Sequence, residues 1–210
     1  MSTNPIRGLY AITDADCQPP ERLLEAVAEV LDAGARVLQY RDKSGNSALR
    51  EEQAAGLRAL SRGRALFLVN DDVELAARVG ADGVHLGEQD AALSAARKRL
   101  GPNAVIGISC YNDLQRARDA QAAGADYAAF GAFFPSGTKP LARRAEPALL
   151  RAARAELRLP LVAIGGITPE NAPALLEAGA DAVAVIRGIF AQAHPGAAAA
   201  AYVRCFSGRF

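Results

Sequence analysis

The chain has 210 residues, 50% of them hydrophobic, which suffices for one large buried core. Its 24 basic and 23 acidic residues give a formal net charge of +1, so no long-range field attracts nucleic acid or an anionic membrane. No apolar run approaches the ~20 residues of a membrane span, and the start lacks the apolar segment of a secretion signal. We therefore predict one domain over residues 1–210, in the cytoplasm, without a nucleic-acid or membrane partner.

Four similar segments punctuate the chain, and each joins the end of a helical pattern to the start of an apolar run. These segments, which read Ala-Gly-Ala or Gly-Ala-Asp, lie at residues 33–35, 80–82, 124–126 and 179–181. A glycine just after a helix can adopt the left-handed conformation that ends it, so each segment predicts a helix end followed by a strand. Four further apolar runs follow other glycine or proline signals, at residues 9–13, 65–69, 104–109 and 161–164.

The segments between these eight runs carry apolar residues at spacings of three and four, as in Val27, Val30 and Leu31, which is typical of helices. The tail from residue 192 is expected to add a last outer helix. Eight βα units in roughly 190 residues favour a closed (β/α)8 TIM barrel, with its site at the carboxyl-terminal ends of the strands. An open doubly wound sheet is the alternative, because alternation alone does not show closure.

Two neighbouring apolar runs end in acidic residues. One stops at Asn70, Asp71 and Asp72, and the next stops shortly before Asp90. The intervening segment, 73–79, has room only for a crossover helix, so the two strands are expected to be parallel neighbours with their carboxyl ends on one face. A helix cap needs only Asp72 or Asn70, which leaves Asp71 over. Oxygen ligands from adjacent strand ends match a Mg²⁺ site that phosphates and water complete.

Other strand ends add amides and cations. After the second predicted strand, alternation directs Gln39, Arg41 and Lys43 to one side, although a solvated charged turn would also explain the cations. Gln39 favours a site, because an amide among apolar strand residues needs a hydrogen-bond partner. His85 lies inside a strand and far along the chain from His194, so we expect a packed, hydrogen-bonded residue rather than a metal ligand or a base.

Three loops on the same face are suited to phosphate. The loop at residues 133–140 combines glycine, hydroxyl groups and Lys139, and we expect it to cover a phosphorylated ligand. Its Gly-Thr-Lys run lacks the spacing of a P-loop. The seventh and eighth strands end near Gly166 and Arg187, where barrels of this kind bind a phosphate through backbone N–H groups. One face thus offers a monophosphate site beside a cation and carboxylate cluster for a more highly charged phosphate.

Together these motifs resemble the thiamine phosphate synthase family across essentially the whole barrel. The matching runs are residues 8–14, 37–44, 69–72, 81–90, 107–109, 138–140 and 163–171. The resemblance implies a transferase of thiamine biosynthesis that joins 4-amino-2-methyl-5-hydroxymethylpyrimidine diphosphate to a thiazole (carboxylate) phosphate and releases diphosphate. It further implies Mg²⁺ as cofactor and these two small molecules as partners, and it leaves a homo-oligomer open.

The resemblance also implies a role for each matching position. The catalytic contacts would be Arg41, Ser109 and Lys139, and the ligands of Mg²⁺ would be Asp71 and Asp90. The pyrimidine diphosphate would be bound by Gln39, Tyr40, Arg41, Asp42, Lys43, Asn70, Ser109 and Lys139. The thiazole phosphate would be bound by Ser136, Gly137, Thr138, Gly166, Ile186 and Arg187. Catalysis would consist of leaving-group stabilisation and positioning, without a protein nucleophile.

Three positions depart from the family pattern. Arg187 stands where serine is frequent, and it would either add a cation to the phosphate site or point away from it. Ser136 replaces a common threonine, and Tyr111 replaces a common histidine. The related thiazole tautomerases share the barrel and rely on a histidine in this region, so Tyr111 favours the synthase over a tautomerase-like isomerase. A third hypothesis, a non-catalytic barrel that only binds a thiamine precursor, is disfavoured by the complete set of acids and cations.

Overall fold

The computed structural model of the chain describes residues 6–87, 93–135 and 143–208. Eight parallel strands form a closed barrel, in which each strand pairs with the next one along the chain and β8 pairs with β1. The strands are β1 (Gly8–Ile12), β2 (Val37–Tyr40), β3 (Leu66–Asn70), β4 (Gly83–Leu86), β5 (Val105–Tyr111), β6 (Tyr127–Phe130), β7 (Leu161–Ile164) and β8 (Ala182–Val185). This closure confirms the predicted (β/α)8 barrel and excludes the open sheet.

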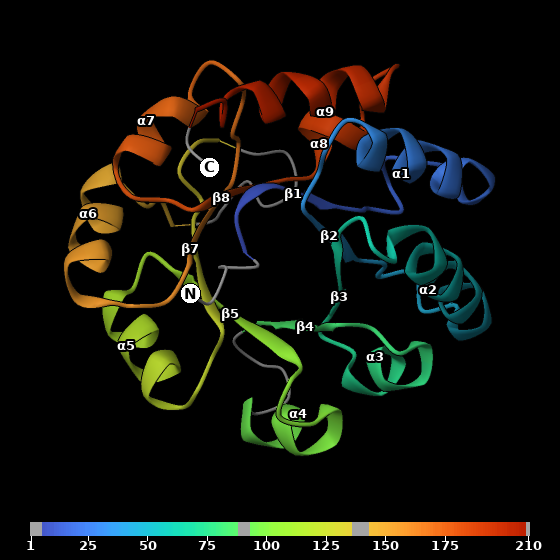
Figure 1. The fold of residues 1–210 in the computed structure, drawn as a ribbon, viewed down its shortest axis with the longest axis horizontal. Coiled ribbons are helices and arrows are strands. Elements are labelled where there is room, and N and C mark those ends of the chain that lie inside the picture. The colour runs from blue at the N-terminus through green and yellow to red at the C-terminus, as the bar shows by residue number, and fades with distance from the viewer. Residues whose placement is uncertain (1–5, 88–92, 136–142, 209–210) are drawn as a thin grey trace.

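Helices surround the barrel and alternate with its strands (Figure 1). After a short 3-10 turn (Pro20–Arg22), they are α1 (Leu23–Asp32), α2 (Ser47–Ser61), α3 (Val73–Val79), α4 (Leu93–Leu100), α5 (Leu114–Ala122), α6 (Pro147–Glu156), α7 (Ala172–Glu177), α8 (Arg187–Phe190) and α9 (Pro195–Arg204). The crossover helix between β3 and β4 has the predicted bounds, and the expected tail helix is α9. In the part of the chain that the structure describes, no helix is both long and apolar enough to cross a membrane.

The glycine punctuation works as predicted. Gly34, Gly80, Gly124 and Gly179 all have positive φ values, of 102°, 64°, 86° and 111°. Residues with a Cβ rarely adopt this left-handed conformation, so glycine at these positions ends one helix and turns the chain into the next strand. The repeat therefore sets the spacing of the βα units.

Alternate residues of the strands pack on opposite sides of the barrel wall. One hydrophobic cluster lies between the strands and the helices and includes Leu38, Phe67 and Val84. A second cluster fills the barrel interior and includes Tyr10, Val37, Leu68, Tyr127 and Val162. The interior is thus a packed core, which leaves the loops at the carboxyl-terminal ends of the strands as the place for a ligand.

Candidate active site

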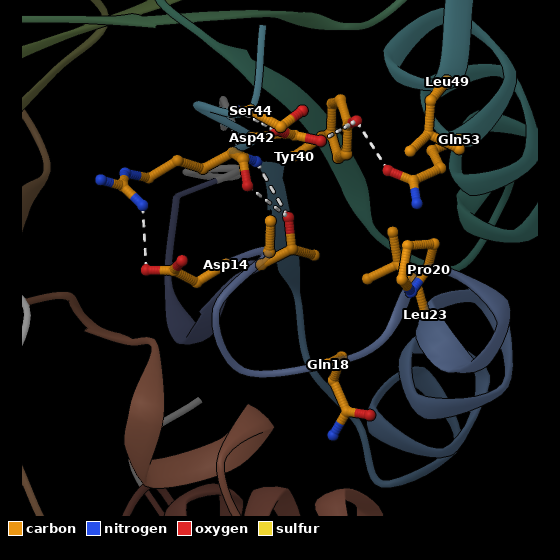
Figure 2. A pocket seen from close by; sticks show the side chains of 12 residues that line it. Asp14, Gln18, Pro20, Leu23, Tyr40, Asp42, Ser44, Leu49 and Gln53 are labelled. Atoms are coloured by element: carbon orange, nitrogen blue, oxygen red, sulfur yellow. Dashed lines mark hydrogen bonds and ion pairs between the residues drawn. The ribbon is translucent and has the colours of Figure 1, made fainter. Parts of the chain in front are cut away.

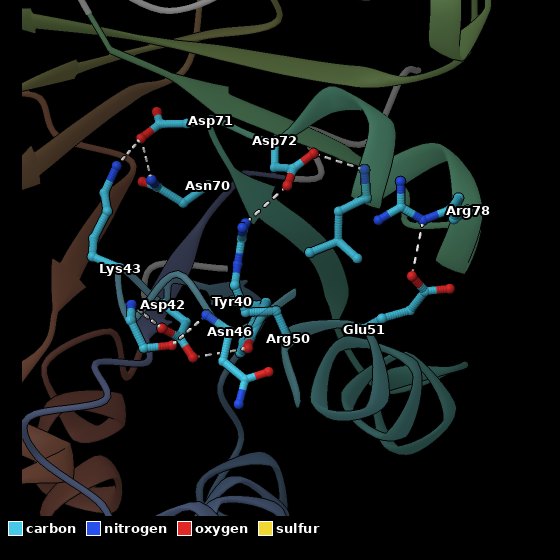
Figure 3. Close-up of polar contacts among 12 residues, drawn as sticks. Tyr40, Asp42, Lys43, Asn46, Arg50, Glu51, Asn70, Asp71, Asp72 and Arg78 are labelled. Atoms are coloured by element: carbon cyan, nitrogen blue, oxygen red, sulfur yellow. Dashed lines mark hydrogen bonds and ion pairs between the residues drawn. The ribbon is translucent and has the colours of Figure 1, made fainter. Parts of the chain in front are cut away.

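The two aspartates that follow β3, Asp71 and Asp72, have different partners (Figure 3). Asp72 caps α3, because its carboxylate accepts the N–H of Leu75 at 2.8 Å, and it also pairs with Arg50 at 2.9 Å. Asp71 faces away from the helix and is bonded to the side chains of Asn70 and Lys43, the latter at 2.5 Å. The cap predicted at this strand end is therefore Asp72, and Asp71 is left for another role.

The backbone at Asp71 is unusual. Its φ is 63°, a left-handed value that side chains other than those of asparagine and aspartate seldom tolerate. The N–H of Asp71 donates to the carbonyl of His85 on β4 at 2.9 Å, which fixes this turn against the neighbouring strand. A non-glycine residue held in this region costs conformational energy, and such positions cluster at functional sites.

The side chains of Gln39, Arg41 and Lys43, at and after the end of β2, point in more different directions than strand alternation predicts. The Gln39 side chain points into the barrel, where its Nε2 donates to the hydroxyl of Tyr10. Arg41 reaches the loop after β1, where its guanidinium pairs with Asp14 at 2.9 Å, and Lys43 reaches Asp71, directly after β3. The three side chains share one end of the barrel but contact different neighbours, so the prediction that they face one volume is only partly correct.

Arg41 is held by two consecutive residues at the end of β1. Its backbone N–H donates to the Thr13 hydroxyl at 2.9 Å, and its guanidinium bonds the nearly buried carboxylate of Asp14. Neither Thr13 nor Asp14 was among the predicted site residues. The signal that would have identified Asp14 is the one used for Asp71, a carboxylate directly after an apolar strand.

Tyr40 and Asp42 lie on a different side from the group around Asp71. The Tyr40 hydroxyl donates to Gln53 on α2 at 2.8 Å and lies 3.3 Å from Asp42. Both residues line a pocket between the ends of β1 and β2 and the first turns of α1 and α2 (Figure 2). Burial raises the pKa of Tyr40 above that of an exposed phenol. The structure thus separates these two predicted substrate contacts from Lys43 and Asp71.

His85 and Ser109 meet at the ends of β4 and β5. The two nitrogens of the His85 ring lie 2.9 Å from the Tyr127 hydroxyl and 2.9 Å from the Ser109 hydroxyl. The guanidinium of Arg116 donates to the Ser109 carbonyl at 2.7 Å and lies over the Tyr111 ring. The strand register shifts between Ser109 and Tyr111, whose φ is 53°. His85 is therefore hydrogen-bonded, as expected.

The loops predicted to bind phosphate follow β6, β7 and β8, at the same carboxyl-terminal end of the barrel. Gly166, after β7, has a φ of 62°, and a Cβ there would lie 2.3 Å from the carbonyl oxygen of Pro135. Only glycine therefore allows the loops after β6 and β7 to pack together. Ile186 precedes the short helix α8, and Arg187 begins it. The Arg187 guanidinium is 3.8 Å from the sulfur of Cys17, which places it toward the β1–α1 loop.

The profile of the thiamine monophosphate synthase family matches residues 9–189. The chain belongs to this family. It is 55% identical to the thiamine-phosphate synthase of Nitrosococcus oceani, over 97% of this chain and 94% of that protein, and 55% identical to that of Chromobacterium violaceum, over 97% and 98%. The solved thiamine phosphate pyrophosphorylase from Pyrococcus furiosus is 36% identical, with a TM-score of 0.87 and 96% coverage of both chains.

Membership of the thiamine monophosphate synthase family establishes the enzyme class. The chain is a transferase of thiamine biosynthesis that acts on small molecules. The two relatives at 55% identity are named thiamine-phosphate synthases.

Five residues that the family resemblance assigns to the site fall outside the described residues. They are Asp90, Ser136, Gly137, Thr138 and Lys139. Within residues 6–87, 93–135 and 143–208, no cluster of three or more His, Cys, Asp or Glu side chains is placed to hold a metal ion.

Proposed function

We propose that this synthase joins 4-amino-2-methyl-5-hydroxymethylpyrimidine diphosphate to a thiazole phosphate, forming thiamine phosphate and diphosphate. The observation that carries the proposal is the pairing of Lys43 with Asp71 at 2.5 Å, at the end of the barrel where Arg41 pairs with Asp14. Two cations and an adjacent carboxylate at neighbouring strand ends suit a metal-bound diphosphate.

The bond changes require stabilisation of charge rather than a protein nucleophile. The bond between the pyrimidine methylene carbon and the diphosphate oxygen breaks, and its electron pair leaves with the diphosphate. The electron-rich aminopyrimidine ring stabilises the resulting cation, and the lone pair of the thiazole nitrogen then forms the new carbon–nitrogen bond. Arg41, Lys43 and Lys139 stabilise the charge on the leaving diphosphate, and Gln39, Asn70 and Ser109 orient the pyrimidine.

The donor set is compatible with Mg²⁺. Asp71 offers a carboxylate at a strand end, and its partner Lys43 has a side chain that is 59% exposed and can turn to a phosphate. Asp71 and Asp90 would hold the ion. When bound, Mg²⁺ neutralises part of the charge on the diphosphate.

The thiazole phosphate binds across the barrel end from this cluster. Gly166 lets the loops after β6 and β7 pack together beside this site, and Ile186, Arg187 and residues 136–138 would supply further contacts. A phosphate bound chiefly by backbone N–H groups needs few charged side chains.

The test is to incubate the purified enzyme with both substrates and Mg²⁺ and to quantify all products by chromatography. Thiamine phosphate and diphosphate should appear in equal amounts, and chelation of Mg²⁺ should stop the reaction. Binding of both substrates without product would contradict a catalytic role. Isomerisation of a thiazole substrate in the absence of the pyrimidine would instead favour the tautomerase alternative.

A further inference from the structure

A continuous chain of hydrogen bonds crosses the barrel interior beneath the candidate site. Gln39 Nε2 donates to the Tyr10 hydroxyl at 2.5 Å, and the Tyr10 and Tyr127 hydroxyls are 2.8 Å apart. The Tyr127 hydroxyl is 2.9 Å from Nδ1 of His85, whose Nε2 is 2.9 Å from the Ser109 hydroxyl. Strands β2, β1, β6, β4 and β5 each contribute one member. Both ends of the chain, Gln39 and Ser109, are residues that we assign to the pyrimidine.

The barrel is built to accommodate the two tyrosines at its centre. Tyr10 and Tyr127 are 1% and 0% exposed, and their rings meet edge to face with centroids 6.1 Å apart. A Cβ on Gly107 of β5 would lie 1.9 Å from the Tyr127 ring, so glycine at that position makes room for it. Two phenylalanines would fill the same space without two buried hydroxyls, which must be hydrogen-bonded to avoid a cost in stability.

The first member of the hydrogen-bond chain favours one order of donors and acceptors. An amide Nε2 only donates, so the Tyr10 oxygen accepts. Burial raises the pKa of both tyrosines well above the usual range, so each keeps its single hydrogen. The arrangement in which Tyr10 donates to Tyr127 and Tyr127 donates to Nδ1 of His85 gives every hydroxyl hydrogen an acceptor, and it places the ring proton on Nε2, directed at Ser109. The ends of the chain are thus the Gln39 amide oxygen, an acceptor, and the Ser109 hydroxyl hydrogen, a donor.

We propose that Tyr10 and Tyr127 are positioning residues that hold Gln39 as an acceptor and Ser109 as a donor for the aminopyrimidine ring. An aminopyrimidine presents the complementary groups, an amino group that donates and ring nitrogens that accept. The inference rests on the proposed function for the identity of this substrate. Neither tyrosine touches the ligand in this scheme, and both act through the residues at the chain ends.

The main test is Tyr127→Phe, which keeps the ring and removes one hydroxyl. The KM for the pyrimidine diphosphate should rise about 5- to 10-fold, as expected for loss of an oriented hydrogen bond, while the KM for the thiazole phosphate stays unchanged. Tyr10→Phe, which interrupts the same chain one residue earlier, should give the same pattern and replaces the first variant if that one does not fold. In the double variant Tyr127→Phe/Ser109→Ala, the pyrimidine KM should rise no further than in Ser109→Ala alone.

Tyr202→Phe is the matched control. Tyr202 is also buried, at 3% exposure, and its hydroxyl donates to the Ile167 carbonyl at 2.9 Å, on the β7 loop. This variant should leave the pyrimidine KM unchanged. Unaltered kinetics in both Tyr10→Phe and Tyr127→Phe, or an equal rise in both KM values, would overturn the inference. The proposed function is judged separately, by whether the unmodified enzyme forms thiamine phosphate.

Discussion

At the amino-terminal end of the barrel, three aspartates occupy equivalent positions, one directly before each of β4, β6 and β8, whereas the carboxyl-terminal end has Asp71 directly after β3. Each of the three accepts a backbone N–H from the preceding strand and pairs with an arginine of α2, α4 or α6. The sets are Asp82 with Phe67 and Arg58, Asp126 with Ile106 and Arg97, and Asp181 with Leu161 and Arg154. Asp71 is instead bonded to the side chains of Asn70 and Lys43.

Asp82 and Asp71 differ in how much of the fold would change if their hydrogen-bond partners moved. Asp82 accepts the N–H of the fully buried Phe67 at 2.8 Å, and it cannot release that group without disturbing β3. Lys43 is largely exposed and can leave Asp71 for a phosphate with little change in the fold. The pair of Asp82 and Arg58 therefore helps to build the barrel, whereas the pair of Asp71 and Lys43 can exchange, as expected for a barrel whose site lies at the carboxyl-terminal ends of its strands.

The strongest test of this comparison is Asp71→Asn. Asparagine also adopts the left-handed conformation, so the free energy of unfolding should change by less than about 0.5 kcal/mol. The lost charge should lower kcat/KM by about 10²-fold or more, because charge placed for the leaving group is removed. Steady-state kinetics with both substrates, together with urea unfolding, measure the two quantities.

Asp72→Asn is the control for that variant. It removes the adjacent charge but keeps a side chain that caps α3 well, so the activity should stay normal. A kcat/KM close to normal for Asp71→Asn, with both substrates varied, would contradict a role for Asp71 in the reaction.

At the other end of the barrel, Asp82→Ala should have the opposite effect. It leaves the N–H of Phe67 without its acceptor and removes the partner of Arg58, so we expect a loss of about 2–3 kcal/mol in the free energy of unfolding. The KM values of both substrates should not change at temperatures where the variant is folded. Urea unfolding followed by circular dichroism measures the loss, and a selective fall in activity at unchanged stability would contradict the comparison.

Much of this architecture could be predicted from local signals. The repeated glycine segments predicted four of the strands, and other glycine or proline signals before apolar runs predicted the remaining four, because both kinds of signal depend on neighbouring residues only. A cap of α3 at the end of β3 also followed from local rules, which left Asp72 and Asn70 as candidates, and the structure shows that Asp72 is the cap. The bounds of α3 were correct for the same reason.

The features that could not be predicted depend on contacts between distant residues. The hydroxyls of Tyr10 and Tyr127 meet across 117 residues of sequence, and tyrosine within a strand is ordinarily read as core packing. The register shift at Tyr111 is set by pairing between β5 and β6. Tyr40 was assigned to the ligand with its neighbours, although strand alternation places it on the α2 side, opposite to Gln39.

A smaller effect is expected from Asp72→Ala, which removes the cap instead of replacing it. The Leu75 N–H loses its acceptor, and Arg50 loses its partner. Loss of an N-terminal cap costs about 1 kcal/mol, so the unfolding midpoint in urea should fall while the slope of the transition stays the same. An unchanged midpoint would mean that water replaces this cap without cost.

The smallest effect is expected from removing an ion pair that does not bond the strand backbone. Such a variant tests whether an ion pair alone, wherever it lies, stabilises the barrel. Glu51 on α2 pairs with Arg78 on α3 at 3.1 Å (Figure 3). Glu51 lies near the start of α2, and Arg58 lies near the end of the same helix. Both side chains are about half exposed, at 52% and 46%, and neither bonds a strand N–H in this contact. Glu51→Ala should therefore change the free energy of unfolding by no more than about 0.5 kcal/mol, and the change should vanish at high salt. A loss as large as that of Asp82→Ala would mean that the ion pair, rather than the bond to the strand backbone, supplies the stability of the amino-terminal end.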